Sequence, residues 1–207
     1  ISKEPHLGGV CLNRGCIPSK ALLHLAKIIQ DAQSLKKAGI DFNAPKLNLE
    51  KIQKWKSSII KKLESGIEQL AKAREVQIIK GTATFISSNK LQICSNEKNQ
   101  TISFDNCIIA TGSTSSKIPN FSKENKKILY SANALELQNI PKNMLIIGGG
   151  YIGLEMGTVY NSFGTEVTVV EFMPSLLPNI DNDLVKPLLQ KLKNNFKQII
   201  LSTKVTK

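Results

Sequence analysis

The chain has 207 residues, of which 41% are hydrophobic and 21% are charged, and these values are typical of a soluble globular protein with one large domain or two ordinary ones. No apolar run reaches the about 18 residues that a membrane-spanning helix needs, and the first residues lack the organisation of a signal peptide. The formal net charge is +12, but the few aromatic residues do not alternate with the basic ones as a nucleic-acid stacking surface requires. We therefore expect no nucleic-acid site and a solvated basic face instead, which on one predicted helix comprises Lys51, Lys54, Lys56, Lys61 and Lys62.

A pair of cysteines lies in the first informative segment, Gly-Gly-Val-Cys-Leu-Asn-Arg-Gly-Cys-Ile-Pro-Ser-Lys at residues 8–20. Cys11 and Cys16 stand at the start of a predicted helix, where the partial positive charge of the helix terminus favours a thiolate, and Lys20 can add a full charge. Because five residues turn a regular helix through about 500°, a bond between the two sulfurs requires an irregular turn, for which Gly15 supplies backbone freedom. The segment therefore suits reversible disulfide exchange.

Two other interpretations of the cysteine pair stay open on spacing alone. The cysteines can be structural, or they can form half of a zinc site, which needs four ligands. No second ligand pair at metal spacing is found among His6, His24, Cys94 and Cys107, so we expect no metal. The adjacent Gly8 and Gly9 would allow a main chain to approach a phosphate closely.

Helices and short strands are predicted next along the chain. Apolar residues at helical spacing predict helices over residues 21–39 and 49–73. Short segments of β-forming residues, separated by turns, predict an antiparallel meander with strands at 76–80, 82–86, 90–94 and 101–104. A further short strand is predicted at 107–110, and a polar stretch after it contains one short helix at 132–137.

A dinucleotide-binding motif follows an apolar strand predicted at residues 144–147. The motif is Gly148-Gly149-Gly150-Tyr151-Ile152-Gly153, a G-x-G-x-x-G that opens a predicted helix ending near Gly164. A second strand at 167–170 ends at Glu171, which lies 21 positions after Gly150, as expected for the acidic residue that binds the ribose. Because a carboxylate repels a 2′-phosphate and no arginine follows it, Glu171 favours NAD over NADP.

The cysteine segment closely resembles the active-site signature of the pyridine nucleotide–disulfide oxidoreductases, a family that includes dihydrolipoamide dehydrogenase, glutathione reductase and mercuric reductase. The resemblance implies that Cys11 exchanges with the substrate disulfide, that Cys16 makes the charge-transfer contact with a flavin, and that Lys20 approaches the flavin ring. Further implied FAD contacts are Gly8, Gly9, Val10 and Cys11 itself. Cys94 and Cys107 match no motif of the family, and we interpret them as structural.

The same resemblance extends to residues outside the cysteine segment. From its position alone, Glu155 is an ordinary glutamate near a helix start, but the resemblance implies that it reaches the junction of flavin and nicotinamide and forms an ion pair with Lys20. Thr111-Gly112-Ser113 resembles the second flavin motif of the family. Ala83 resembles the position whose backbone contacts the adenine.

The resemblance implies an α/β fold with two Rossmann-like nucleotide-binding domains, both incomplete. We expect an FAD-binding domain with a β-meander at residues 1–116, without its first strand and first G-x-G-x-x-G. A linker at 117–140 and the start of an NAD-binding domain at 141–207 follow. The catalytic base, a histidine–glutamate pair in the family, is expected beyond residue 207.

The implied activity is oxidation of dihydrolipoamide through the cysteine pair and FAD, with reduction of NAD. The implied partners are the dihydrolipoyl domain of a 2-oxo acid dehydrogenase complex and, at full length, a second copy of the chain. The expected location is the cytoplasm, or the mitochondrial matrix in a eukaryote. Three alternatives remain: another NAD-linked disulfide or metal reductase, a truncated nucleotide-binding chain without catalysis, and a basic nucleic-acid-binding protein.

Overall fold

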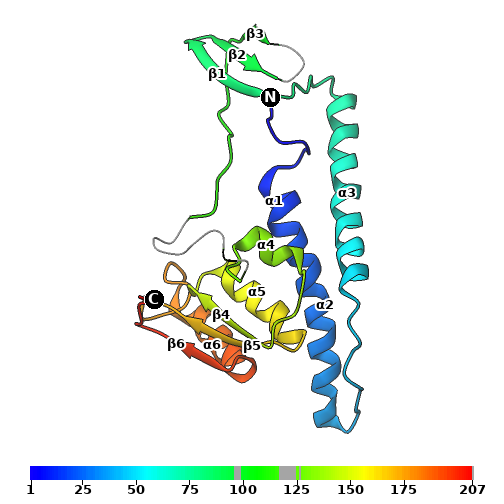
Figure 1. The fold of residues 1–207 in the computed structure, drawn as a ribbon, viewed down its shortest axis with the longest axis vertical. Coiled ribbons are helices and arrows are strands. Elements are labelled where there is room, and N and C mark those ends of the chain that lie inside the picture. The colour runs from blue at the N-terminus through cyan, green and yellow to red at the C-terminus, as the bar shows by residue number, and fades with distance from the viewer. Residues whose placement is uncertain (96–98, 117–124, 126, 207) are drawn as a thin grey trace.

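The computed structural model describes residues 1–95, 99–116, 125 and 127–206. Two three-stranded sheets form in this part of the chain: an antiparallel sheet of order β1-β2-β3 and a parallel sheet of order β4-β5-β6. Figure 1 shows the antiparallel sheet at one end of the long axis, with the long helices α2 and α3 side by side below it. The fold is therefore α/β, with separate antiparallel and parallel parts.

The helices near the N-terminus are α1 (Gly9–Arg14), α2 (Cys16–Ser34) and α3 (Leu49–Ala73), with a short 3-10 helix at Leu35–Ala38. The prediction for α3 is confirmed at both ends. Its first turn is capped by Asn48, whose side chain accepts a hydrogen bond of 2.9 Å from the Lys51 backbone N–H, as N-caps do. Helix α2 begins five residues earlier than predicted, because Pro18 is tolerated in a first helical turn.

The antiparallel sheet contains β1 (Thr82–Ser87), β2 (Lys90–Cys94) and β3 (Gln100–Ser103), which confirms three strands of the predicted meander. The strand predicted at residues 76–80 is wrong. Only Lys80 pairs there, in an isolated parallel bridge with Ser2. An extended segment becomes a strand only where a second strand runs alongside, and Ser2 supplies a single residue.

The strand predicted at residues 107–110 is also wrong. This stretch has no regular structure, and Ile108 and Ile109 are 93% and 70% exposed. In the described part of the chain no strand pairs with residues 107–110. Their apolar side chains therefore do not become part of a sheet.

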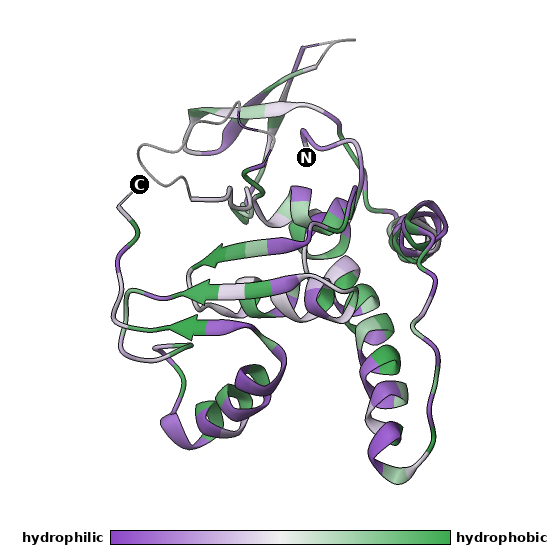
Figure 2. Cartoon of the chain, turned by 60° about the horizontal axis from the view of Figure 1, so that its bottom comes forward, coloured by the Kyte–Doolittle hydropathy of each residue, from purple (hydrophilic) through white to green (hydrophobic). Residues whose placement is uncertain are grey.

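The parallel sheet is built from β4 (Asn143–Ile147), β5 (Glu166–Val170) and β6 (Gln198–Ile200). Helix α5 (Tyr151–Ser162) connects the first two strands, as predicted, and α6 (Asn182–Asn195) connects the last two. Figure 2 shows the three strands side by side, with hydrophobic residues along each of them. These elements form two successive β-α-β units. The sequence patterns predict the first unit only, since they indicate no element after residue 171.

Two apolar clusters hold these parts together. One joins Leu22 and Ala26 of α2 to Val159 and Tyr160 of α5, and it includes the short helix α4 (Ser131–Glu136), which confirms the predicted helix at 132–137. The other lies where α5 and α6 pack on β5. The helix that follows the cysteines and the helix that follows the glycine motif therefore share one core. No helix among the described residues is both long and apolar enough to cross a membrane.

Candidate functional site

The cysteine pair lies where the chain passes from α1 to α2. Gly15 separates the two helices with φ −143° and ψ −112°, which confirms the irregular turn that the spacing requires. A Cβ atom on Gly15 would lie 3.0 Å from the Val10 carbonyl oxygen and 3.2 Å from the Cys11 Cα. Cys11 and Cys16 are both exposed, and both are free cysteines. The glycine therefore allows the sharp turn between the two cysteines, which leaves Cys11 near enough to raise the pKa of Cys16.

The thiol of Cys16 is less acidic than the sequence led us to expect. Its hydrogen bond with Cys11, together with desolvation and the neighbouring Cys11 charge, raises the pKa of Cys16 above the ordinary thiol value. Lys20 lowers this pKa, as predicted, but its effect is the smaller one. The backbone at the helix start and Lys20 therefore both favour a Cys16 thiolate, as predicted, but Cys11 and desolvation outweigh them, because two adjacent thiols resist a second ionisation.

Lys20 and Glu155 form an ion pair between α2 and α5. The Lys20 Nζ lies 2.5 Å from the Glu155 Oε1, and the two side chains are 62% and 24% exposed. The predicted ion pair is therefore confirmed. It joins the helix that begins at Cys16 to the helix that begins after the glycine motif, across 135 positions of sequence.

The glycine motif forms the tight turn between β4 and α5. Gly148 has φ +106°, a conformation that favours glycine. A Cβ on Gly153 would lie 2.9 Å from the Gly148 carbonyl oxygen and from the Ile146 Cγ2. Tyr151 and Ile152, at the start of α5, are exposed. The loop thus has the close packing between helix and strand that a dinucleotide-binding turn needs.

Glu171 is directed at this glycine motif from the end of β5. It is 8% exposed, and its Oε2 accepts a hydrogen bond of 2.5 Å from the Gly149 N–H. Its Oε1 accepts a second bond of 2.7 Å from the Met173 N–H. Two backbone donors therefore hold the carboxylate beside the loop, at the carboxyl edge of the parallel sheet where dinucleotides bind in such folds.

The remaining predicted FAD residues are not gathered with this group. Ala83 lies on β1, an exposed strand of the antiparallel sheet, and Figure 1 shows that sheet at the far end from α5. Thr111, Gly112 and Ser113 lie in an exposed stretch without regular structure. Gly8 and Gly9 both have positive φ, and a Cβ on Gly9 would meet open space, so the backbone there is accessible beside exposed Val10.

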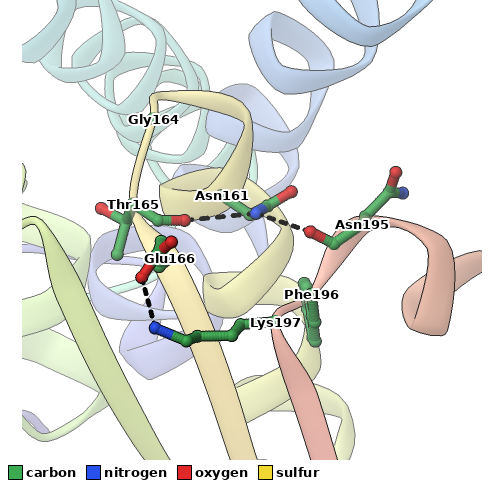
Figure 3. A pocket seen from close by; sticks show the side chains of 7 residues that line it. All are labelled: Asn161, Gly164, Thr165, Glu166, Asn195, Phe196 and Lys197. Carbon is green, nitrogen blue, oxygen red and sulfur yellow. Dashed lines mark hydrogen bonds and ion pairs between the residues drawn. The ribbon is translucent and has the colours of Figure 1, made fainter.

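A shallow pocket of about 370 Å³ lies at the opposite edge of the parallel sheet (Figure 3). Asn161 donates hydrogen bonds to the carbonyl oxygens of Thr165 and Asn195, and Lys197 pairs with Glu166 at 2.6 Å. These contacts tie the end of α5 to the start of β5 and to the end of α6. The polar groups are used by the fold itself, and no predicted site residue lines this pocket.

The expectation that Lys56 belongs to a solvated basic face is wrong. Lys56 is only 8% exposed, and its Nζ donates a hydrogen bond to the Leu135 carbonyl oxygen at the end of α4. From the sequence, a lysine on an amphipathic helix is expected to be exposed to solvent. The hydrogen-bond partner of Lys56 lies 79 positions away, and no local pattern indicates it. Among the described residues, no three His, Cys, Asp or Glu side chains gather as metal ligands do.

Comparisons with known proteins agree with this geometry. Residues 3–207 match the family described as pyridine nucleotide-disulphide oxidoreductase. Dihydrolipoyl dehydrogenase of Vibrio cholerae is 44% identical over 206 residues, and that of Haemophilus influenzae is 46% identical over 207 residues. Each alignment covers 100% of this chain and 43% of the relative.

Solved structures of two bacterial proteins have a similar fold. LpdA from Mycobacterium tuberculosis has a TM-score of 0.87 at 19% identity, over 100% of this chain and 46% of that chain. The HOCl-induced flavoprotein disulfide reductase RclA from Escherichia coli has a TM-score of 0.79 at 26% identity, over 99% and 43%. The chain thus spans less than half the length of the proteins that it matches.

The family model matches nearly the whole chain. The structure has a cysteine pair at a helix start, a glycine turn held by an acidic residue, and an ion pair between the two helices that follow them. Together these findings show that the chain belongs to the family of pyridine nucleotide-disulphide oxidoreductases.

Proposed function

We propose that this chain is the front part of a dihydrolipoamide dehydrogenase that uses FAD and NAD. The observation that carries the proposal is the Lys20–Glu155 ion pair, because it couples the dithiol helix to the helix of the glycine turn. Identities of 44% and 46% to dihydrolipoyl dehydrogenases support the choice of substrate within the family.

The residues present fit a dinucleotide at the glycine turn. A Cβ on Gly149 would lie 2.5 Å from the Leu176 Cδ2 and 3.1 Å from the Glu171 Oε2, so a side chain there would press on the carboxylate. The second glycine of the motif, Gly150, leaves its Cβ position open, which would let a pyrophosphate approach the backbone. Gly148, Gly150 and Gly153 complete the turn, and the N-terminus of α5 favours a negative charge there. Glu171 would accept hydrogen bonds from the ribose hydroxyls and repel a 2′-phosphate, which supports NAD.

The FAD site would be formed by residues around the dithiol. Cys16 and Lys20 lie on the first two turns of α2, and exposed Gly9 leaves its backbone open. In this proposal residues 1–116 belong to the FAD-binding domain and 141–207 to the NAD-binding domain. When bound, FAD supplies two-electron transfer between the cysteine pair and NAD. Thr111, Gly112, Ser113 and the Ala83 backbone are the further proposed contacts.

The cysteine pair can accept two electrons from dihydrolipoamide by thiol–disulfide exchange, without any other redox group. A dihydrolipoamide thiolate attacks Cys11 of the oxidised pair and forms a mixed disulfide, while Cys16 leaves as a thiolate. The second substrate thiol then displaces Cys11, so lipoamide gains its S–S bond and the pair holds two electrons. Lys20 would stabilise negative charge on Cys16, and Glu155 would hold the Lys20 ammonium.

The partners and location follow from the proposed reaction. A dihydrolipoyl domain of a 2-oxo acid dehydrogenase complex would deliver the substrate, in the cytoplasm or, in a eukaryote, the mitochondrial matrix. We propose a homodimer for the complete gene product, since the family's catalytic base acts across a dimer.

A second candidate is an NAD-linked disulfide or metal reductase. A Cu(II) complex of RclA, 28% identical to this chain, has been solved, which favours this alternative.

The visible absorption spectrum of the complete gene product tests the proposal. We expect the wild-type protein to show a flavin spectrum that gains a long-wavelength band on anaerobic titration with dihydrolipoamide. The Cys94→Ser variant should gain the same band, and the Cys16→Ser variant should not. Absence of flavin from the complete gene product contradicts the proposal. A flavin reduced by NADH but not by dihydrolipoamide favours the second candidate.

A further inference from the structure

The short helix α4 ends in a cluster of hydrogen bonds from two other helices. The last carbonyl groups of a helix have no partner within it. Here Ala134 O accepts from the Tyr160 hydroxyl at 2.9 Å, Leu135 O accepts from the Lys56 ammonium, and Leu137 O accepts from the Gln53 amide at 2.9 Å. Gln53 and Lys56 lie on α3 and Tyr160 lies on α5. We call these three side chains the α4 clamp.

Lys56 is the most costly member of the α4 clamp to bury. Desolvation lowers its pKa, and the charge of Glu136 offsets this only in part. An ammonium group taken from water needs compensating contacts. The carboxyl end of α4 provides one, since carbonyl oxygens gather there with partial negative charge.

The backbone at the end of α4 is held in an unusual conformation. Leu137 has φ +55° and ψ +47° and is fully buried. A residue other than glycine rarely adopts this conformation, and it persists where the surroundings over-determine it. Gln53 binds the carbonyl oxygen of this same residue, so the clamp acts on the point where the chain turns away from α4.

The α4 clamp lies between the two halves of the proposed site. Lys56 lines a cavity of about 220 Å³ together with Asn13, Arg14 and Pro18 of the cysteine segment. Tyr160 lies on α5, the helix that carries Glu155. Helix α3 packs on α2, and α4 packs on both α1 and α5. Helices α2 and α5 also pack on each other directly, and the clamp adds α3 and α4 to the helices around that contact.

We propose that Gln53, Lys56 and Tyr160 are positioning residues that hold α4 as a spacer between the cysteine segment and α5, and so keep Lys20 in contact with Glu155. The value of that contact for catalysis rests on the proposed function, whereas the positioning itself does not. If the clamp only stabilised α4, its loss would change stability and leave the Lys20–Glu155 contact as frequent as before.

Zero-length cross-linking of the full chain with a carbodiimide distinguishes these two cases. The reagent joins an amine to a carboxylate that touches it, so the Lys20–Glu155 amide measures their contact by mass spectrometry. The Lys197–Glu166 pair, on β5 and just before β6, is the internal standard. We expect the ratio of the two cross-links to fall at least fivefold in Lys56→Met and to stay within twofold of wild type in Lys56→Arg.

Two further variants keep the test decisive. Lys54→Met removes a lysine of the same helix whose exposed partner is Glu50, and the ratio should not change. Tyr160→Phe removes only the hydroxyl, and we expect the ratio of the two cross-links to fall at least twofold. If Lys56→Met fails to fold, this variant tests the proposal in its place. Wild-type ratios in folded Lys56→Met and Tyr160→Phe would overturn the proposal. The assay needs neither flavin nor dihydrolipoamide, so a failure of the proposed function leaves its result intact.

Discussion

The proton of Cys16 is subject to opposing effects from its neighbours. The hydrogen bond with Cys11 raises the pKa of Cys16, and Lys20 lowers it. Since only the thiolate reacts with an alkylating reagent, Cys16 of the reduced protein should be alkylated slowly until the pH exceeds the ordinary thiol pKa. Cys11→Ala removes the largest cause, so the midpoint of the pH–rate profile should move to lower pH. Lys20→Ala should move it to higher pH. Rates of iodoacetamide labelling, resolved by peptide, measure both shifts; a profile that stays in place in Cys11→Ala would contradict this account.

The carboxylate of Glu171 accepts two backbone N–H groups, from Gly149 and Met173. In Glu171→Ala both donors lose their acceptor, and the proposed ribose contact is lost as well. We expect the NADH dissociation constant to rise about tenfold, which corresponds to about 1.4 kcal/mol, and the discrimination against NADPH to weaken. Glu166→Ala, on the same strand but at its exposed start, is the control. Titration of both nucleotides into the three proteins measures the effect, and unchanged affinities in Glu171→Ala would refute it.

At the scale of elements, two glycines with different surroundings predict opposite changes in stability. Gly66 lies inside α3, and a Cβ there meets nothing within 4 Å, so Gly66→Ala should raise the free energy of unfolding by about 0.5–1 kcal/mol. Gly15 separates α1 from α2 with Val10 O only 3.0 Å from the Cβ position, so Gly15→Ala should lower it by about 1–3 kcal/mol. Urea unfolding measures both values. Gly15→Ala should also slow oxidation of the cysteine pair, and equal stability of the two variants would argue against the tight turn.

At the scale of the whole molecule, large apolar side chains remain on the surface of this chain. Ile108 and Ile109 are the most exposed, and Phe85 and Ile86 of β1 are about half exposed. Exposed apolar side chains promote association when they gather on a surface. We expect the 207-residue chain to bind an apolar dye and to self-associate, and the double variant Ile108→Lys, Ile109→Lys to do both less, without loss of stability. Sedimentation velocity and dye fluorescence test this against Ile28→Lys on α2, and equal association of all three proteins would contradict it.

Local patterns were sufficient for much of the fold. The bounds of α3 follow from an amphipathic run with Asn48 as its N-cap, and these are properties of neighbouring residues. The β4-α5-β5 unit follows from a glycine turn between apolar strands. The strands predicted at 76–80 and 107–110 failed because a strand depends on a partner that a local pattern does not name.

The candidate site shows the same division between local and distant effects. By itself the sequence determined the family signature at Cys11 and Cys16, the glycine turn with Glu171, and, through resemblance, the Lys20–Glu155 pair, because short motifs dictate these residue types. Only the tertiary structure decided that Lys56 is buried at the end of α4 and that α2 and α5 share one core. The physical reason is that desolvation and hydrogen bonding depend on which distant groups approach in space, and the periodicity of a single segment carries no information about them.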